Sequence, residues 1–158
     1  MTWFSWLHHV SLHVPLVMTM VLGVFGVWIN RRSNAPGEAN DILWKILRFG
    51  GWATAGVTLI AVISGMITAE DFWTQDGPMI LIHHRNLGLT GFACVFTAVG
   101  ATEWGIRRGQ ERVRRFGALC WLVASFAMIG AGHWGGSGVH SDRIPWQEEP
   151  PVLRSGDK

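Results

Sequence analysis

The chain has 158 residues, of which 49% are hydrophobic and only 15% are charged. A charged fraction this far below the usual value of about 25% argues against an ordinary soluble domain. The formal net charge of +2 comes from basic loops between apolar stretches, so we expect no nucleic-acid binding.

Four apolar stretches are each about as long as the 20 residues needed to cross a hydrocarbon core of roughly 30 Å. They cover residues 3–29, 49–68, 80–101 and 116–134. Short loops make neighbouring helices antiparallel, so we predict an all-α fold, an integral membrane four-helix up-down-up-down bundle. Residues 1–140 form this domain, and residues 141–158 form a polar tail. No internal repeat is predicted.

The basic residues define the orientation of the bundle. The segments after the first and third stretches hold nine of the thirteen Lys and Arg residues: Arg31, Arg32, Lys45, Arg48, Arg107, Arg108, Arg112, Arg114 and Arg115. The positive-inside rule places these segments in the cytoplasm, and therefore places both termini and the tail in the periplasm of a bacterial inner membrane. The first stretch starts without a basic segment and contains histidines, so we expect it to be retained rather than cleaved as a signal peptide.

The first stretch carries three histidines. His13 lies 18 positions before Arg31, which corresponds to roughly 27 Å along a helix. His9 lies one turn before His13, and such a pair can also bind a transition metal. His8 is a weaker candidate because it is closer to the outer boundary.

The segment between the first two stretches is predicted to contain a short amphipathic interfacial helix, Asp41–Arg48. Its lipid-facing side chains would be Ile42, Leu43, Trp44, Ile46 and Leu47. The tryptophans are predicted to form two belts at the headgroup level. The outer belt comprises Trp3, Trp6, Trp73, Trp134 and Trp146. The inner belt comprises Trp28, Trp44, Trp52, Trp104 and Trp121.

The third stretch opens with the strongest ligand candidate, His84. Gly88 and Gly91 follow it at i+4 and i+7, so the helix face below the imidazole has no side chains for two turns. A flat macrocycle needs such a slot. His83 lacks these glycines and is a poorer candidate. Arg85 is placed to pair either with lipid phosphate or with haem propionates.

The fourth stretch ends in a glycine-rich segment around His133, with Gly130, Gly132 and Gly136 leaving room for a planar cofactor or ending the helix. His140, beyond this stretch, is a further candidate for a ligand or hydrogen-bonding partner. The two cysteines, Cys94 and Cys120, are predicted to be packed free thiols.

Three of these histidines reach the same predicted depth. His133 lies 18 positions after Arg115 and His84 lies 19 positions before Glu103, which matches the depth of His13. Ionisable side chains at such depth usually face the bundle interior and mark relays or cofactors. We therefore expect His13, His84 and His133 to form one layer and to supply the axial ligands of a haem iron.

Three segments carry a resemblance to a known family: His13-Val14-Pro15, His84-Arg85-Asn86-Leu87-Gly88, and 132–140 with its sequence GHWGGSGVH. The chain resembles the four-helix bacterial membrane proteins catalogued as domain of unknown function 2231, which often occur fused or adjacent to periplasmic c-type cytochromes. The resemblance implies a b-type haem or a related redox role. Ser141 stands where cytochrome-linked members commonly have glycine, and we expect any c-type partner to be a separate polypeptide.

These observations predict a b-type cytochrome subunit of a larger redox complex rather than a stand-alone enzyme. One or two haem b groups would be bound by His84 with His13 or His133, while His9 or His140 would serve a second haem. Electrons would pass between a membrane donor, such as quinol, and a periplasmic c-type cytochrome. Two alternatives stay open: a porphyrin-free copper or zinc site built from histidines, and a structural scaffold subunit.

Overall fold

The computed structural model describes residues 3–32, 38–68 and 79–140, and this part of the chain is helical apart from one tight turn. The helices are α1 (Trp3–Arg32), α2 (Glu38–Thr68), α3 (Met79–Arg108) and α4 (Glu111–His140). All four are long and apolar enough to cross a membrane, which confirms the predicted all-α fold with four spans. A helix suits this role because it satisfies its own backbone hydrogen bonds in a medium without water.

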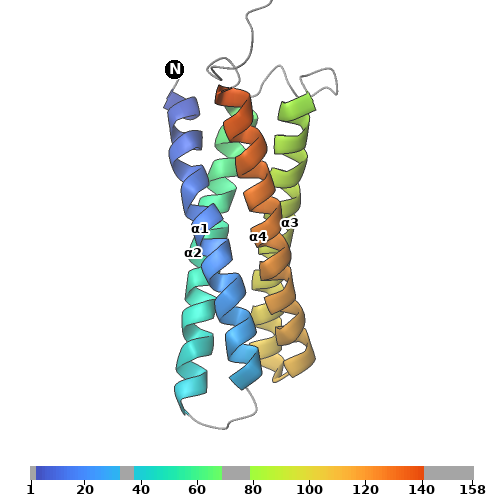
Figure 1. The fold of residues 1–158 in the computed structure, drawn as a ribbon. Helices are drawn as coiled ribbons and strands as arrows, with labels where there is room; N and C mark the ends of the chain where they lie inside the picture. Colours follow the sequence, from blue (N-terminus) through green and yellow to red (C-terminus); the bar gives the residue numbers. More distant parts are fainter. Residues whose placement is uncertain (1–2, 33–37, 69–78, 141–158) are drawn as a thin grey trace, which may run out of the picture.

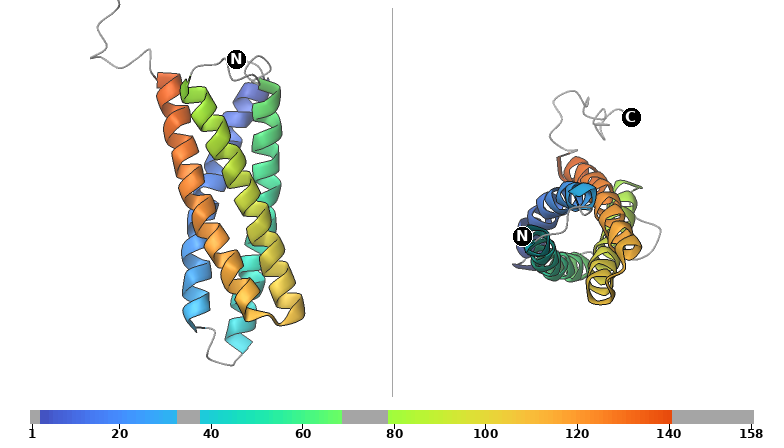
Figure 2. Two further views of the ribbon diagram at one scale, coloured as in Figure 1. Left: turned by 90° about the vertical axis from the view of Figure 1, so that its right-hand side faces the viewer. Right: turned by 90° about the horizontal axis from the view of Figure 1, so that it is seen from below.

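The helices form a single ring in the order α1, α2, α3, α4, with α4 also packed against α1 (Figures 1 and 2). The most extensive contact is between α3 and α4, and the least extensive of the four neighbouring contacts is between α2 and α3. Figure 1 shows α1 and α3 starting at the end of the bundle where α2 and α4 finish. The N-terminal turns of α1 and α3 and the C-terminal turns of α2 and α4 therefore lie at the same end of the bundle.

The hydrophobic core is built from buried side chains of all four helices. Trp121, Ile29 and Val95 have no exposed surface there. Small residues permit the close approach, because a Cβ on Gly26 would lie 3.2 Å from the Cβ of Ala118 on α4. Between α3 and α4, Gly109 takes a positive φ of 64°, and Gln110 N donates to Gly105 O, which closes the chain into a short turn.

Several predicted details are wrong. Asp41–Arg48 is no separate interfacial helix, because α2 runs without a break from Glu38 to Thr68. Trp44 and Leu47 are buried in the bundle core instead of facing lipid, whereas Ile42 and Ile46 are exposed as predicted. Trp121 is also in the core, since it lies between helices and not on the outer surface.

Other tryptophans do lie on the outer surface, as a headgroup belt requires: Trp3, Trp6, Trp28, Trp52 and Trp104. Cys94 and Cys120 are half-buried free thiols, as predicted. The glycines from Gly132 to Gly136 do not end the fourth helix, which continues to His140. The predicted tail, 141–158, lies outside the described residues.

Candidate functional site

Two imidazoles from different hairpins meet at the end of the bundle where α1 and α3 begin. The ring centres of His8 on α1 and His84 on α3 are 6.1 Å apart, and the ring planes are at 89° to each other. Both residues are half-buried. This pair lies between the α1–α2 hairpin and the α3–α4 hairpin.

Each of these imidazoles is oriented by a backbone carbonyl of the next helix. His8 Nδ1 donates to Ala61 O of α2 at 2.8 Å, and His84 Nδ1 donates to Ala131 O of α4 at 2.7 Å. A carbonyl oxygen can only accept, so the proton of each neutral ring is on Nδ1 and the lone pair is on Nε2. A hydrogen bond from Nδ1 to a backbone carbonyl is one of the contacts that typically fix the tautomer of a metal-ligating histidine.

A glycine provides the space beside each ring. An ideal Cβ on Gly65 of α2 would lie 2.6 Å from His8 Cε1, and one on Gly135 of α4 would lie 2.7 Å from His84 Nδ1. Real Cβ atoms essentially never come this close to another heavy atom. Each glycine follows the hydrogen-bonded alanine by four positions, so both residues of an Ala-x-x-x-Gly segment lie on one helix face.

The two hairpins thus repeat the same arrangement. His84 follows His8 by 76 positions, as Trp104 follows Trp28 and Arg108 follows Arg32. The Arg32 guanidinium lies over the Trp28 ring at 4.3 Å, and Arg108 lies over Trp104 at 5.1 Å. On the partner helices, Ala131 and Gly135 follow Ala61 and Gly65 by 70 positions. The two hairpins therefore share these contacts at matching positions, although no internal repeat is predicted from the sequence.

The predicted layer of His13, His84 and His133 is not a single cluster. His84 points towards the other hairpin, whereas His13 on α1 and His133 on α4 are exposed on the outer surface of the bundle. His133 contacts the ring of Trp134, with 5.7 Å between ring centres. Equal distance from the basic face along three helices predicts that these residues lie at the same depth. It does not determine which of them face the interior of the bundle.

The other predicted site residues are distributed around the pair. His9 is exposed, and its ring centre lies 6.0 Å from that of His8. Arg85 is half-buried beside His84, and its Nε donates to Asn86 Oδ1 at 3.4 Å. His140 ends α4, but its side chain lies outside the described part of the structure.

The two glycines below His84 differ from each other. Gly88 borders open space, with no atom within 4 Å of an added Cβ. Gly91 is covered by Met128 of α4, whose Cε would lie 2.9 Å from such a Cβ. The predicted slot is therefore open at Gly88 and filled by a side chain at Gly91.

Distance from the basic face favours His13 over His8, but it is His8 whose ring contacts that of His84. The signal that identifies His8 is the repeat of His, Trp and Arg at one offset in α1 and α3. Burial follows the same offset: Pro15, Thr19 and Leu22 are buried on α1, and Gly91, Val95 and Ala98 are buried on α3. His8 and His84 consequently occupy equivalent positions on equivalent helices.

The donor set of this site is two imidazoles. Two imidazoles that share one metal ion at a metal–nitrogen distance of about 2 Å have ring centres roughly 6 Å apart. The observed spacing of 6.1 Å between the ring centres fits two imidazoles that would hold one metal ion, and a haem iron takes two protein ligands. Within residues 3–32, 38–68 and 79–140, no group of three or more His, Cys, Asp or Glu side chains could hold a metal ion.

Comparison with protein-family models, curated proteins and solved structures gives no match to this chain. The resemblance to domain of unknown function 2231 therefore stays a prediction from the sequence.

Proposed function

We propose that the chain is a membrane b-type cytochrome subunit in which His8 and His84 bind one haem b without a covalent bond. The observation that carries this proposal is the facing pair of imidazoles, each with its Nδ1 proton held by a helix carbonyl. Nε2 is therefore the nitrogen of each ring that can bind a metal, and the two ligands are chemically equivalent. His8 replaces His13 and His133 as the partner of His84, because those two are exposed on the outer surface.

The bundle is oriented as the basic residues predict, in an up-down-up-down arrangement with both termini in the periplasm of a bacterial inner membrane. The ends of α1 and α3 that carry Arg31, Arg32, Arg107 and Arg108 then face the cytoplasm. The histidine pair faces the periplasmic side. A carrier such as a soluble c-type cytochrome approaches from that side.

Two neutral imidazoles make the iron of a bound haem low-spin, a state suited to electron transfer rather than oxygen chemistry. The protein residues have three tasks around such a group. His8 and His84 would hold the iron, the carbonyls of Ala61 and Ala131 fix the two rings, and the Arg85 guanidinium, next to His84 in the chain, would pair with a propionate. The chain then serves as an electron-transfer subunit between a membrane donor and the periplasmic carrier.

Spectroscopy and metal analysis of the purified full chain test this proposal. We expect a reduced-minus-oxidised spectrum of low-spin b-type haem and about one haem per chain by the pyridine haemochrome assay. The double variant H8A/H84A should lose this haem, whereas H13A/H133A, which carries the same number of substitutions on the exposed surface, should keep it.

Two results would overturn the proposal. A colourless protein with stoichiometric copper or zinc would favour a porphyrin-free metal site. A protein that binds neither haem nor metal when expressed with added haem would leave a scaffold subunit.

A further inference from the structure

A shallow groove runs along the outer surface of α1, in the half of the helix nearer its basic end. It is open to the surroundings, has a volume of about 620 Å³ and is lined by five side chains of α1: Met20, Val21, Val24, Phe25 and Trp28. All of these except Phe25 are exposed. Because α1 is long and apolar enough to span a membrane, a groove on its outer surface contacts the acyl chains of the bilayer.

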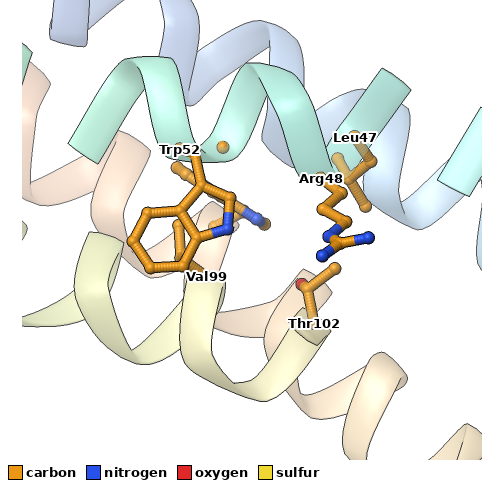
Figure 3. Close-up of a pocket in the computed structure, with 7 residues that line it drawn as sticks. Leu47, Arg48, Trp52, Val99 and Thr102 are labelled. Atoms are coloured by element: carbon orange, nitrogen blue, oxygen red, sulfur yellow. The ribbon is translucent and has the colours of Figure 1, made fainter. Parts of the chain in front are cut away.

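The hollow between α2, α3 and α4 is different, because side chains of the protein fill it (Figure 3). It has no room for a water molecule. A Cβ added to Gly51 would lie 3.1 Å from the Trp121 ring, and one added to Gly117 would lie 2.9 Å from Thr102 Oγ1. This region is therefore packed core and not a binding site.

A guanidinium lies at the end of the α1 groove that is nearer the membrane surface. Arg32 covers the Trp28 ring at 4.3 Å from the ring centroid, and Trp28 stacks on Phe25 with 5.7 Å between ring centres. The contact with Trp28 restricts the Arg32 side chain, so less conformational entropy is lost when its N–H groups bind an acceptor. A positive charge and an apolar groove thus adjoin each other within about two turns of one helix.

The charge of Arg32 is not neutralised by a neighbouring side chain. Arg48 and Arg107 both pair with Glu103, whereas no carboxylate pairs with Arg32 in the part of the chain that the structure describes. Arg31 precedes Arg32, so the end of α1 carries two positive charges. The guanidinium fork matches the oxygens of a phosphate group. The groove and the charge together therefore match a phosphate diester that carries acyl chains.

The matching end of α3 has the same charge without the same groove walls. Arg108 lies over its own tryptophan ring at 5.1 Å. The residues of α3 that are equivalent to Val24 and Phe25 are the smaller Gly100 and Ala101, 76 positions later. Arg108 is therefore a control for the effect of charge alone.

We propose that the basic end of α1 binds one anionic phospholipid, whose phosphate pairs with Arg32 and whose acyl chain lies in the groove between Trp28 and Met20. Each arginine near the membrane surface favours a lipid with a net negative head group. The groove adds van der Waals contact, because lipid chains are as apolar as the side chains they touch. Arg32 lies 24 positions after His8, roughly 36 Å along α1, so this site is independent of haem at the histidine pair.

Native mass spectrometry of the delipidated full chain in detergent tests the charge. The probes are phosphatidylglycerol and phosphatidylcholine with the same palmitoyl and oleoyl chains. We expect the first phosphatidylglycerol to bind more tightly than phosphatidylcholine. Arg32→Gln should weaken its binding about fivefold, the effect of one arginine near an anionic lipid. Arg108→Gln removes the same charge from α3 and should leave its binding unchanged.

A second pair of variants tests the groove. Val24→Trp fills it at a residue that is 69% exposed, and should weaken the binding of both lipids. Val123→Trp is the matched control, because Val123 on α4 is 52% exposed and lies eight positions from Arg115, as Val24 does from Arg32.

Four results would overturn the proposal. Equal binding of the two lipids would mean that the head-group charge is not recognised. Equal losses in Arg32→Gln and Arg108→Gln would reduce the effect to net charge, and equal losses in Val24→Trp and Val123→Trp would exclude the groove. Competition by inorganic phosphate alone would show a site for a free anion instead of a lipid.

Discussion

The two hairpins place equivalent histidines in surroundings that are alike near the ring and different below it. In α1–α2, His8 bonds Ala61 O and lies against Gly65, and in α3–α4, His84 bonds Ala131 O and lies against Gly135. One hairpin has Pro15 two turns below its histidine, whereas the other has Gly91 covered by Met128. The contacts that orient the rings are repeated, while the packing beneath them is not.

Filling the space beneath the rings and orienting the rings place different requirements on the sequence. Packing can be satisfied by proline or by a glycine with a methionine over it, because any combination of the right volume fills the space. The orientation of an imidazole needs a carbonyl at one position and the absence of a Cβ one turn later. A pattern that persists where packing varies therefore points to a role of the rings themselves.

Substitution of either interior histidine should have the largest effect. We expect H8A and H84A each to lose low-spin haem, because one axial ligand cannot maintain a six-coordinate low-spin iron. The exposed H13A and H133A should retain it. Absorption spectra of the four purified variants make the comparison, and full low-spin haem in H8A would remove His8 from the axial pair.

The next largest effect should come from the glycines that make room for the rings. A Cβ in G65A or G135A would lie 2.6–2.7 Å from an imidazole atom, so the ring must move and its bond to the carbonyl must lengthen. We expect each variant to weaken haem retention about tenfold, equivalent to about 1.4 kcal/mol. Haem titration of the apoprotein measures this.

Controls for these variants exist in the same helices. No atom lies within 4 Å of a Cβ added to Gly56 on α2 or to Gly136 on α4, so G56A and G136A should bind haem as the unchanged chain does. Equal losses in all four variants would mean that helix flexibility, and not space beside the rings, determines the affinity.

The number of helices could be predicted from the sequence, whereas the burial of individual side chains could not. Four apolar stretches were sufficient for the helix count because length and hydrophobicity alone determine which segments can span a bilayer. Trp44 and Leu47 were misplaced because an apolar residue near a predicted boundary can face either lipid or protein. Tertiary contacts between helices made that choice, and they are not a property of one helix.

The site was predictable in part for a related reason. His84 was recognised from its glycine spacing, although the glycine that contacts its ring is Gly135 on another helix. His13 was ranked high on depth, and depth carries no information about rotation around the helix axis. His8 could have been found by aligning α1 with α3, since both end in a Trp-x-x-Arg-Arg segment at the same distance from the histidine.

A substitution in the packing beneath the rings should show a difference between the two hairpins in stability rather than in haem binding. Met128 fills the space over Gly91, so M128A should lower the free energy of unfolding by about 2–5 kcal/mol through the cavity it leaves. The equivalent residue of the first hairpin is Thr58, whose hydroxyl donates to Thr54 O, and T58A should cost only about 1 kcal/mol. Thermal unfolding in detergent compares the two, and a larger loss in T58A would contradict the proposed difference in packing.

The smallest effect should come from an ion pair that joins the two hairpins. Glu103 of α3 accepts both hydrogen bonds from Arg48 of α2 and also one from Arg107, at the least extensive contact between neighbouring helices. The Arg48 side chain is 45% exposed, so E103Q should cost no more than about 1 kcal/mol. E111Q, which affects an i,i+4 pair with Arg115 on one helix, should cost about 0.5 kcal/mol or less.

Cross-linking between two introduced cysteines measures the contact between the hairpins. The cysteines replace the exposed residues Trp52 of α2 and Gly100 of α3. Because E103Q loosens the contact between the hairpins and E111Q does not, only E103Q should increase the cross-linking. Equal cross-linking in the two variants would show that the hairpins are held together by the core and not by this ion pair.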